Sequence, residues 1–406
     1  RIKHYIENSL NEKSSVQLKA NKLANKLVPV TLGLAGISYI FAKDFERVAS
    51  ILQADYSCAL KLATPVAFKS TISKAGHNGI MIKGAKSIEA LNSADTFIFD
   101  KTGTLTYGEL EVISVESYNK EWSEEELLNL TASTEEHYFH PVAEAVVKAA
   151  KQRGFVHMHH EEVEFIVAHG VKTEINEKSV VIGSRHFLED DEKIDFSPYK
   201  EKIEDSLKDG KTLLYIAYDG KLLGTIGLAD ELRHNAKKAI SDLRKLGVKN
   251  IIMLTGDTKE KAQIIAKQLG IDEVRAELLP QDKARIVKEL MDEGKKVAFI
   301  GDGINDAPAL ISSHVGISMS RGADIAKATA DISLLKDDIA CVVEAKEYAY
   351  KTMNLINTNF NTTVAINSGI LAGATFGIFS PIVTAILHNG TTIGLLLNSI
   401  KGVKLK

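Results

Sequence analysis

The feature that most constrains how this chain can fold is the sequence D-K-T-G-T-L-T at residues 100–106, directly after the apolar run at residues 96–99. A β-forming run that ends on an aspartate and then turns at a glycine predicts a strand with a carboxylate at its carboxyl end. In open α/β sheets, ligands bind outside that end of the strands. The hydroxyls and backbone N–H groups that follow can hold phosphate oxygens, so Asp100 is positioned to attack a phosphoryl group and become an aspartyl phosphate.

Two later segments repeat the pattern of a short apolar strand that runs into an acidic turn containing glycine. Residues 251–254 run into the sequence T-G-D at 255–257, and residues 296–300 run into G-D-G-I-N-D at 301–306. Because the carboxyl ends of parallel strands meet at one edge of a sheet, we expect both turns to converge on Asp100.

The acidic residues at this edge predict a magnesium site. Mg²⁺ is usually held by one or two carboxylates together with phosphate oxygens. Asp100 and Asp302, with the backbone carbonyl oxygen of Thr102, are the expected ligands. Lys283, in the sequence L-P-Q-D-K, is expected to offset the phosphate charge.

Length and composition limit the class of protein. A chain of 406 residues is long for one domain, so two or three structural units are expected. The 50 Lys and Arg residues nearly balance the 53 Asp and Glu residues, which argues against a nucleic-acid-binding protein. The only two cysteines, Cys58 and Cys341, do not suggest a disulfide framework, and the polar first residues do not resemble a signal peptide.

Apolar segments lie near both ends of the chain, at residues 27–42, 48–72, 364–379 and 382–397. A bilayer requires about 20 residues per helix, so these segments predict four transmembrane helices. The lysines at positions 401, 404 and 406 are typical of a cytoplasmic flank. Buried helices of a soluble core remain the alternative interpretation.

The region between the apolar segments is expected to contain a split domain and an insert. Residues 93–112 and 229–338 supply the strand-end motifs, and residues 113–228 separate them. The insert combines helical patterns with later alternating strands, which predicts an α+β domain. An insert between the nucleophile and its magnesium residues is suited to presenting a nucleotide.

The ordered motifs at 100–106, 255–257 and 301–306 resemble the signature of P-type ATPases, which are ion pumps driven by ATP. The resemblance implies a haloacid-dehalogenase-like fold: a doubly wound parallel α/β sheet, an inserted nucleotide-binding domain, and flanking transmembrane helices. It makes Asp100 the nucleophile and Thr102 a general acid/base support, with Lys101 and Lys283 also catalytic. The residues that it assigns to support of the phosphorylation domain are Thr255, Gly256, Asp257, Asn305 and Asp306.

The insert carries a pattern similar to the ATP site of the heavy-metal branch of this family. Glu135 and His140 have the expected spacing, and Gly170 belongs to the expected glycine loop, with Gly183 further on. Position 168 is an alanine where that branch has a glycine, which puts the shape of the loop in doubt. An imidazole before Pro141 can stack on adenine, although a histidine–proline pair is also a common start of a helix.

The membrane segments carry a partial match to the ion site of heavy-metal pumps. Cys58 aligns with the second cysteine of their Cys-Pro-Cys motif, and Ser57 replaces its central proline. His388 and Asn389 occupy the place of His-Asp-Gly or His-Glu-Gly in zinc, cadmium and cobalt exporters. Further amides at Asn357, Asn359, Asn361 and Asn367 are either ligands or interhelical hydrogen-bond partners. One thiolate, one imidazole and amide oxygens suit Zn²⁺, Cd²⁺, Co²⁺, Mn²⁺ or Fe²⁺ better than Cu⁺.

The family's T-G-E loop, which belongs to an actuator domain, is absent from this sequence. We therefore interpret the chain as the carboxyl-terminal portion of a pump, without the actuator domain and the upstream helices. The expected layout is a linker at 1–26, two membrane helices in 27–92, the two soluble domains, and two membrane helices in 339–406. The protein is expected in the cell membrane as a multi-pass protein, with its soluble domains in the cytoplasm.

The leading hypothesis is ATP-driven export of a divalent transition metal across a lipid bilayer, with ATP and Mg²⁺. A soluble phosphatase of the haloacid-dehalogenase type is one alternative, but such enzymes place an aspartate where this chain has Thr102. A P-type pump for another cation is a second alternative, against which Cys58 and His388 argue. Two further features have more than one interpretation. His157, His159 and His160 suggest a metal site or, with more weight, a solvated loop; Asp230 and Arg233 resemble an aspartate–arginine pair that the family has near the domain hinge and the nucleotide, while a helix N-cap at Asp230 is an equal alternative.

Overall fold

The computed structural model describes residues 15–54, 56–138, 140–166, 169–208 and 211–405. The chain folds into two compact units. The first takes in the chain up to Asp100 together with residues 235–252 and 279–406, and the second contains residues 101–234 and 253–278. The domain boundaries predicted from the sequence, at 93–112, 113–228 and 229–338, differ from this division and stay predictions.

A seven-stranded sheet contains the strand that ends on Asp100. Its strands, in order across the sheet, are β1 (Ile80–Ile82), β13 (Ile332–Leu334), β12 (Val315–Ser318), β11 (Val297–Gly301), β2 (Thr96–Asp100), β9 (Asn250–Leu254) and β10 (Glu273–Arg275). Strand β11 pairs in parallel with β2 and β12, while β1 pairs antiparallel with β13. Every residue of β2 and β11 is buried, as expected for strands covered on both faces.

Short helices connect these strands. They are α5 (Ala85–Ser93), α9 (Ala236–Lys245), α10 (Lys259–Leu269), α11 (Pro280–Asp292), η4 (Ile304–Asp306), α12 (Ala307–Ser312) and α13 (Asp324–Thr329). Helix α9 shows why they form, since it buries Ala236, Ala239, Ile240 and Leu243 at the three- and four-residue spacing of one helix face. Alternation of strands and helices around a largely parallel sheet confirms the predicted α/β class.

The second unit contains a six-stranded antiparallel sheet. Its strands, in order, are β3 (Thr106–Ser117), β8 (Lys221–Leu232), β7 (Thr212–Tyr218), β6 (Lys178–Gly183), β5 (Gly170–Ile175) and β4 (Glu164–Ile166). The turn η1 (Lys101–Leu105) leads into β3.

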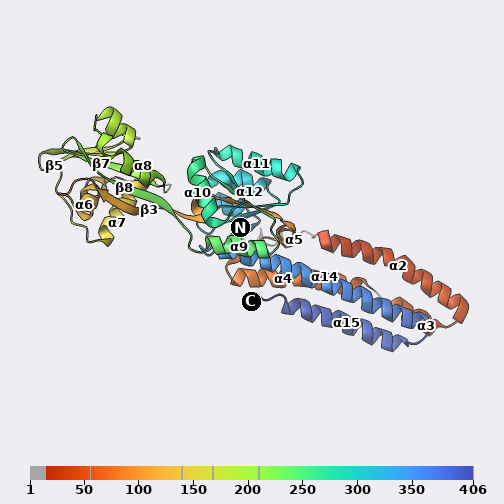
Figure 1. Ribbon diagram of the computed structural model, residues 1–406. Helices are drawn as coiled ribbons and strands as arrows, with labels where there is room; N and C mark the ends of the chain where they lie inside the picture. The colour runs from red at the N-terminus through yellow and green to blue at the C-terminus, as the bar shows by residue number, and fades with distance from the viewer. Residues whose placement is uncertain (1–14, 55, 139, 167–168, 209–210, 406) are drawn as a thin grey trace. The chain divides into compact units, whose positions relative to one another are not determined.

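Both faces of this sheet are covered (Figure 1). Helices α6 (Glu124–Glu135) and α7 (Pro141–Gln152) pack on one face, and η2 (Phe187–Asp191), η3 (Ser197–Tyr199) and α8 (Lys200–Lys208) belong to the other. Strand β6 serves both cores because side chains alternate along a strand: Val180 and Ile182 join the α6–α7 side, and Val181 joins the other.

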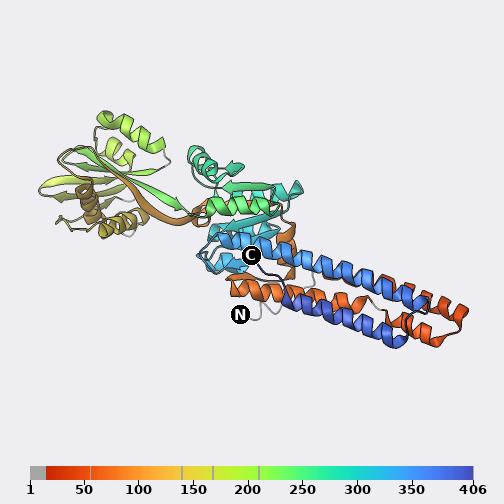
Figure 2. The ribbon, with the colours of Figure 1, turned by 60° about the horizontal axis from the view of Figure 1, so that its bottom comes forward.

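Four long helices and one short helix complete the described part of the first unit. The long ones are α2 (Ser15–Ala42), α4 (Ser57–His77), α14 (Ala340–Thr375) and α15 (Pro381–Lys401), and the short one is α3 (Phe45–Gln53). Helices α4, α14 and α15 contact one another and lie side by side in both views (Figures 1 and 2). The apolar segment at 48–72, expected as one helix, is instead divided into α3 and α4. Helix α3 ends at Gln53, and the following Ala54 has non-helical backbone angles, with φ −77° and ψ 74°.

One helix in the described part of the chain is both long and apolar enough to cross a bilayer. It is α2, through its segment Asn25–Ala42, of which only 11% is buried. The sequence predicted four spans. In α15, polar residues such as His388, Asn389 and Asn398 lower the mean hydropathy of an otherwise apolar helix.

Candidate functional site

The buried carboxylate at the end of β2 lies within a cluster of three aspartates. Asp100 is 6% exposed, and the turn after the neighbouring strand β11 delivers Asp302 and Asp306. One carboxylate oxygen from each of these three residues lies within 4.8 Å of the others. The cluster therefore forms where the parallel strands end, as the sequence indicated.

Lys283 is the basic partner of this carboxylate cluster. Its Nζ donates hydrogen bonds of 2.8 Å to Asp100 Oδ1 and of 2.8 Å to Asp306 Oδ1. The lysine comes from the first turn of α11, which starts at Pro280 with a favourable proline at its first position. Burial raises the pKa of Asp100 well above its ordinary value, and the Asp306 charge adds to this rise while Lys283 opposes it.

Close packing around Asp306 requires a glycine at position 301. Asp306 Oδ2 accepts hydrogen bonds from the backbone N–H groups of Asp302, at 3.2 Å, and Gly303, at 3.1 Å. A Cβ atom at Gly301 would lie 2.7 Å from Asp306 Oδ2, so a side chain there would displace the carboxylate. Asn305, predicted as a supporting residue, is exposed on the short helix η4.

The carboxylate cluster fits a hard divalent cation. Its donors are carboxylate oxygens, which Mg²⁺ prefers, and three acidic groups face the single ammonium of Lys283. Asp100 and Asp302 are thus brought together in the way that the predicted magnesium site needs. Thr102, whose carbonyl oxygen was predicted to contribute, lies in the other unit, with extended backbone and an exposed side chain.

The turn after β2 is held by contacts within the second unit. Lys101 Nζ donates a 2.6 Å hydrogen bond to Asp257 Oδ2, which joins the D-K-T-G-T turn to the T-G-D turn. Thr255 is buried, and its hydroxyl oxygen accepts a 3.1 Å hydrogen bond from the Asp257 N–H. A Cβ atom at Gly256 would lie 3.3 Å from the Leu278 carbonyl oxygen.

Asp230 and Arg233 also hold this turn. The Asp230 carboxylate accepts hydrogen bonds from the Thr106 hydroxyl and the Gly108 N–H, and Arg233 donates to the carbonyl oxygens of Thr106 and Gly103, both at 3.1 Å. The expected helix N-cap at Asp230 is wrong, because this residue lies within strand β8.

The second unit contains a pocket of about 230 Å³ that all four predicted nucleotide residues line: Glu135, His140, Gly170 and Gly183. The two glycines face each other across strands β5 and β6. A Cβ atom at Gly170 would lie 2.0 Å from the Ile182 carbonyl oxygen, and one at Gly183 would lie 2.4 Å from the His169 carbonyl oxygen. Strands β5 and β6 therefore approach so closely at this side of the pocket that positions 170 and 183 both require glycine. Ala168 lies outside the described residues.

His140 has the structural role that its position before Pro141 predicts. Its Nδ1 accepts a 3.3 Å hydrogen bond from the Val142 N–H and caps α7. Its ring also stacks on Tyr138, with centroids 5.6 Å apart and planes inclined by 9°. Both rings line the pocket, so they provide an aromatic surface there.

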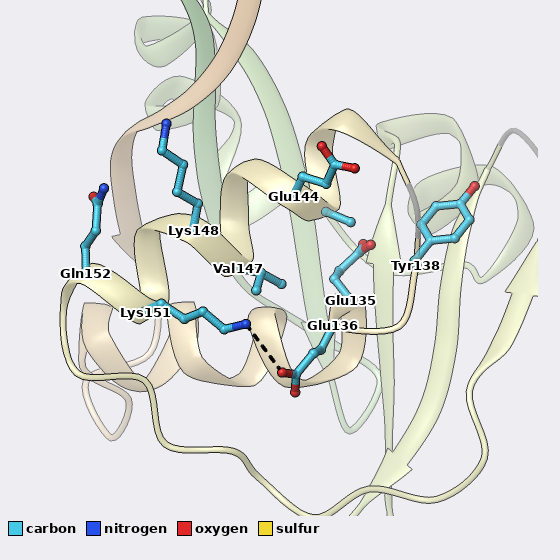
Figure 3. Close-up of a pocket in the computed structure, with 9 residues that line it drawn as sticks. Glu135, Glu136, Tyr138, Glu144, Val147, Lys148, Lys151 and Gln152 are labelled. Carbon is cyan, nitrogen blue, oxygen red and sulfur yellow. Dashed lines mark ion pairs between the residues drawn. The ribbon is translucent and has the colours of Figure 1, made fainter.

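Glu135 is the buried acid of this domain. It is 4% exposed, and burial raises its pKa to about 7. Figure 3 shows Glu135 between Tyr138 and Glu136 in a neighbouring cavity of about 550 Å³, where Lys151 pairs with Glu136 at 3.7 Å. His157 is exposed in a loop, as predicted, and its Nδ1 lies 3.2 Å from Glu136 Oε2.

The residues predicted for the transported ion are only partly brought together. His388 is buried, and its Nδ1 lies 3.4 Å from Asn367 Oδ1 on the neighbouring helix. Asn389 is exposed, because consecutive residues of a helix point in different directions. The side chains of Ser57 and Cys58 lie outside the description; their backbone forms the start of α4.

Further buried amides connect α14 and α15. Asn359 donates a 2.9 Å hydrogen bond to Ser399 Oγ and accepts one of 3.1 Å from Asn398. Asn367 and Asn359 are buried, whereas Asn357 and Asn361 are exposed. Interhelical hydrogen bonding therefore accounts for Asn359, while Asn367 faces the histidine.

Sequence reasoning missed Lys346. Its Nζ donates hydrogen bonds to the carbonyl oxygens of Leu91, Asn92 and Ala94 at 2.8, 2.9 and 2.9 Å, at the end of α5. Burial lowers the pKa of Lys346 to about 8. The signal was available, because Lys346 interrupts the buried face of α14 formed by Val342, Ala345 and Ala349.

Comparisons with known proteins agree with this geometry. The haloacid dehalogenase-like hydrolase family model matches residues 94–314. The chain is 36% identical over 401 residues to a zinc-exporting P-type ATPase of Mycobacterium marinum, covering 98% of this chain and 55% of that protein. It is 37% identical over 402 residues to a manganese-exporting P-type ATPase of Mycobacterium bovis, covering 98% of this chain and 56% of that protein.

The crystal structure of a zinc-transporting PIB-type ATPase in the E2.Pi state superposes with a TM-score of 0.86 and 29% identity, covering 99% of this chain and 66% of the other. The chain thus spans about half the length of the curated relatives it matches. Since the family model covers more than half of the sequence, the chain belongs to the haloacid dehalogenase-like hydrolases and is a homologue of the heavy-metal P-type ATPases.

Proposed function

We propose that this chain is the catalytic and ion-path portion of an ATP-driven exporter of a divalent transition metal. The observation that carries the proposal is the carboxylate cluster: Asp100 is buried at a strand end, bonded to Lys283, and close to Asp302 and Asp306. A buried aspartate in contact with an ammonium can act as a nucleophile toward a phosphoryl group whose charge that ammonium offsets.

The reaction would proceed by in-line displacement. A carboxylate oxygen of Asp100 forms a bond to the γ-phosphorus of ATP, and the bond from that phosphorus to the oxygen bridging to the β-phosphate breaks. ADP leaves with that electron pair, and the chain retains an aspartyl phosphate. Asp100 and Asp302 would hold Mg²⁺, whose charge would offset that of the phosphate oxygens, and the Thr102 carbonyl oxygen stays a predicted third ligand.

The residues around the nucleophile favour a phosphoenzyme that persists. Thr102 stands two residues after Asp100, and a hydroxyl cannot accept a proton at neutral pH as a carboxylate can. Activation of water by this position is therefore weak. Lys101, held on Asp257, keeps the turn in place without occupying the carboxylate cluster.

ATP would be presented by the second unit. The 230 Å³ pocket combines the Tyr138–His140 stack with the backbone of Gly170 and Gly183. An aromatic surface suits the adenine ring, and closely approached glycines leave backbone groups accessible to the rest of the nucleotide. The raised pKa of Glu135 lets it face the nucleotide as a neutral acid near pH 7.

The long helices would form a multi-pass membrane domain. On α15 the large apolar side chains are exposed, including Ile382, Ile386, Ile393 and Leu397, while Thr384, His388 and Ser399 are buried. On α2, Ile40 and Phe41 are likewise exposed. Apolar side chains outside and polar groups inside is the arrangement that lipid requires. The parts of the two units that contain the β-sheets would then lie in the cytoplasm.

The ion path would pass the buried polar groups between α4, α14 and α15. With Nδ1 facing Asn367, the Nε2 of His388 is placed to act as a ligand. Together with Cys58 and Ser57 of α4, this set suits Zn²⁺, Cd²⁺, Co²⁺, Mn²⁺ or Fe²⁺. The actuator domain and the additional helices would come from the part of the longer relatives that this chain does not match.

The test is a metal-dependent phosphorylation and ATPase assay on the protein joined to its upstream region and purified in detergent. We would compare Mn²⁺, Fe²⁺, Co²⁺, Zn²⁺, Cd²⁺ and Cu⁺, with the variants Asp100→Asn, Cys58→Ala and His388→Ala. Stimulation by a divalent ion that all three variants lose supports the proposal. Activity that only Asp100→Asn removes, and that no metal changes, would overturn the transport assignment and leave the phosphoryl-transfer chemistry.

A further inference from the structure

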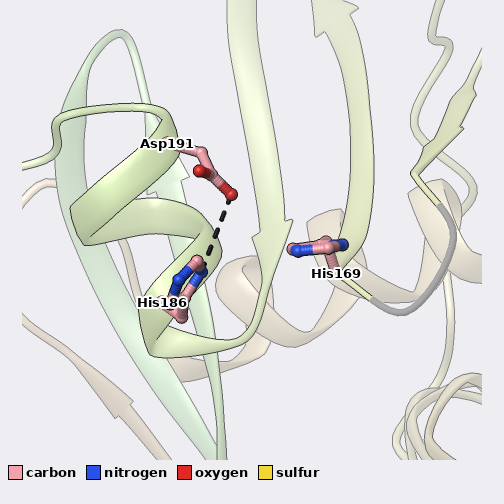
Figure 4. Close-up of side chains that lie close together, drawn as sticks. All are labelled: His169, His186 and Asp191. Atoms are coloured by element: carbon pink, nitrogen blue, oxygen red, sulfur yellow. Dashed lines mark ion pairs between the residues drawn. The ribbon is translucent and has the colours of Figure 1, made fainter.

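A second group of metal-binding side chains lies in the nucleotide-binding unit, away from the carboxylate cluster. It consists of His169, His186 and Asp191, which Figure 4 shows converging from two segments. One ligand atom from each lies within 4.8 Å of the others, and His186 Nδ1 lies 3.7 Å from Asp191 Oδ2. His169 immediately precedes β5, His186 immediately precedes η2, and Asp191 ends η2.

The backbone beneath this group is fixed. The Ser184 N–H donates a 3.1 Å hydrogen bond to the His169 carbonyl oxygen, and the Ser184 hydroxyl accepts one of 3.2 Å from the Phe187 N–H. Phe187 is buried, and its ring meets the His169 ring edge to face at 6.1 Å. The three donor side chains are themselves exposed, so their ends can rotate on a rigid base.

The donor set is specific in its chemistry. Two imidazole nitrogens and one carboxylate oxygen match the protein ligands of zinc sites that keep a fourth position for water, and they are not the all-oxygen set of Mg²⁺ or Ca²⁺. Zinc ligands at about 2.1 Å in a tetrahedron lie about 3.4 Å apart, so small side-chain rotations close the observed separations of up to 4.8 Å.

We propose that His169, His186 and Asp191 bind a divalent transition-metal ion of the Zn²⁺ class in the nucleotide-binding unit, and that this ion regulates nucleotide binding. His169 also lines the 230 Å³ pocket, as do Gly170, Gly183 and Ser184. An ion shared by His169 and the η2 segment would link His169 to the chain that follows Gly183 and Ser184, and so would hold these two sides of the pocket together. A binding site that is already ordered binds its ligand with higher affinity. By thermodynamic linkage, bound nucleotide then raises the affinity for the metal by the same factor.

The metal site stands on its own geometry, whereas its effect on the nucleotide rests on the proposed function of the pocket. The two claims are therefore tested separately. In the first test, Co²⁺ is titrated into the full chain in detergent, and the visible absorption of the bound ion is followed with Zn²⁺ as competitor.

The variants for this titration are His186→Ala and Asp191→Asn, with His159→Ala as the control, since His159 is an exposed histidine of the same unit outside the group. The variant His388→Ala removes Co²⁺ binding at the proposed ion path, so that the remaining absorption can be assigned to other sites. We expect His186→Ala and Asp191→Asn each to lose one Co²⁺ equivalent that His159→Ala and His388→Ala retain. An unchanged spectrum and stoichiometry in His186→Ala would overturn the site.

The second test measures the affinity for an unhydrolysed ATP analogue with and without Zn²⁺ in the Asp100→Asn background. We expect Zn²⁺ to tighten binding by at least about fivefold, and His186→Ala to abolish the effect while His159→Ala keeps it. Co²⁺ binding without any change in nucleotide affinity overturns the regulatory claim. Failure to bind nucleotide under either condition overturns the pocket assignment, and the Co²⁺ titration then still decides the metal site.

Discussion

Helices α11 and α15 each bury one residue with acid–base or ligand chemistry, and they surround it in opposite ways. Helix α11 buries Lys283 beside the apolar residues Ile286, Val287 and Leu290, and it exposes charged residues to water. Helix α15 buries His388 with Thr384 and Ser399, and it exposes isoleucines and leucines. The same chain therefore shows two inside–outside patterns, and the difference is the one we expect if α11 faces water and α15 faces lipid, as proposed above.

The two buried groups also differ in how their polarity is compensated. Lys283 carries a charge that two carboxylates at 2.8 Å neutralise, whereas His388 meets a neutral amide. A core that excludes water can hold an ion pair such as that of Lys283, and the neutral surroundings of His388 are compatible with the ion path proposed above.

The largest expected effect comes from the variant Lys283→Ala, which removes the cation that pairs with the carboxylates of Asp100 and Asp306. Two buried carboxylates then lose their cation, so we expect the free energy of unfolding to fall by about 3–5 kcal/mol. Phosphoenzyme formed from radiolabelled ATP should fall at least about 100-fold. Lys288→Ala, on the exposed face of the same helix, is the control. Equal phosphoenzyme levels in the two variants would refute the role of Lys283.

The next effect tests the lipid-facing side of α15 with Ile386→Asp. In a bilayer, a carboxylate near the middle of a helix costs about 2.5–3.5 kcal/mol, whereas on a water-facing surface the change is nearly neutral. Ile386 is 66% exposed and Ile325 on α13 is 53% exposed, so Ile325→Asp is a matched control. Stability in bicelles should fall only for Ile386→Asp; equal effects would place α15 in water.

Glu135 differs from Lys283 and His388, because burial alone raises its pKa to about 7. Because the pKa of Glu135 is higher in the folded than in the unfolded chain, the folded chain binds the Glu135 proton more tightly. The stability that this proton contributes to the fold is fully present below about pH 4.5 and is lost as the pH rises through 7. If nucleotide binding prefers the neutral acid, affinity should fall about tenfold between pH 6 and 8. Glu135→Gln should make the affinity profile flat, as calorimetric titrations can show.

The smallest expected effect belongs to Thr384→Val. The Thr384 hydroxyl is buried without a hydrogen-bond partner in the described part of the chain, so replacing it by a methyl group of similar shape removes no bond. We expect a change in stability within about 0.5 kcal/mol. Asn359→Leu, which loses bonds to Ser399 and Asn398, is the contrasting variant and should destabilise the helix pair. A large loss in Thr384→Val would show that this hydroxyl has a partner such as the ion.

Local motifs made much of the catalytic geometry predictable. The D-K-T-G-T turn and the G-D-G-I-N-D turn each join a fully buried strand to acidic residues, and parallel pairing of β2 and β11 brings Asp100 near Asp302 and Asp306. Gly170 and Gly183 were also predictable, because backbone contacts leave no space for a side chain.

Long-range and side-specific features were harder to predict. Hydropathy does not show that Asn389 points away from His388's buried face, or that 48–72 breaks between α3 and α4. Nor does a strand pattern reveal that Asp230 bonds to β3, since its partners at Thr106 and Gly108 lie more than a hundred positions earlier. These outcomes depend on tertiary contacts, which local sequence does not specify.

The contact made by Lys346 has a mechanical consequence. An ammonium has three N–H donors, and the carbonyl oxygens of Leu91, Asn92 and Ala94 use all of them. Helix α14 therefore cannot slide along its axis past the end of α5 without breaking three bonds to one atom. Helix α5 leads directly into β2, the strand that ends on Asp100. A displacement of α14 that keeps these three hydrogen bonds must therefore also move the carboxyl-terminal end of α5.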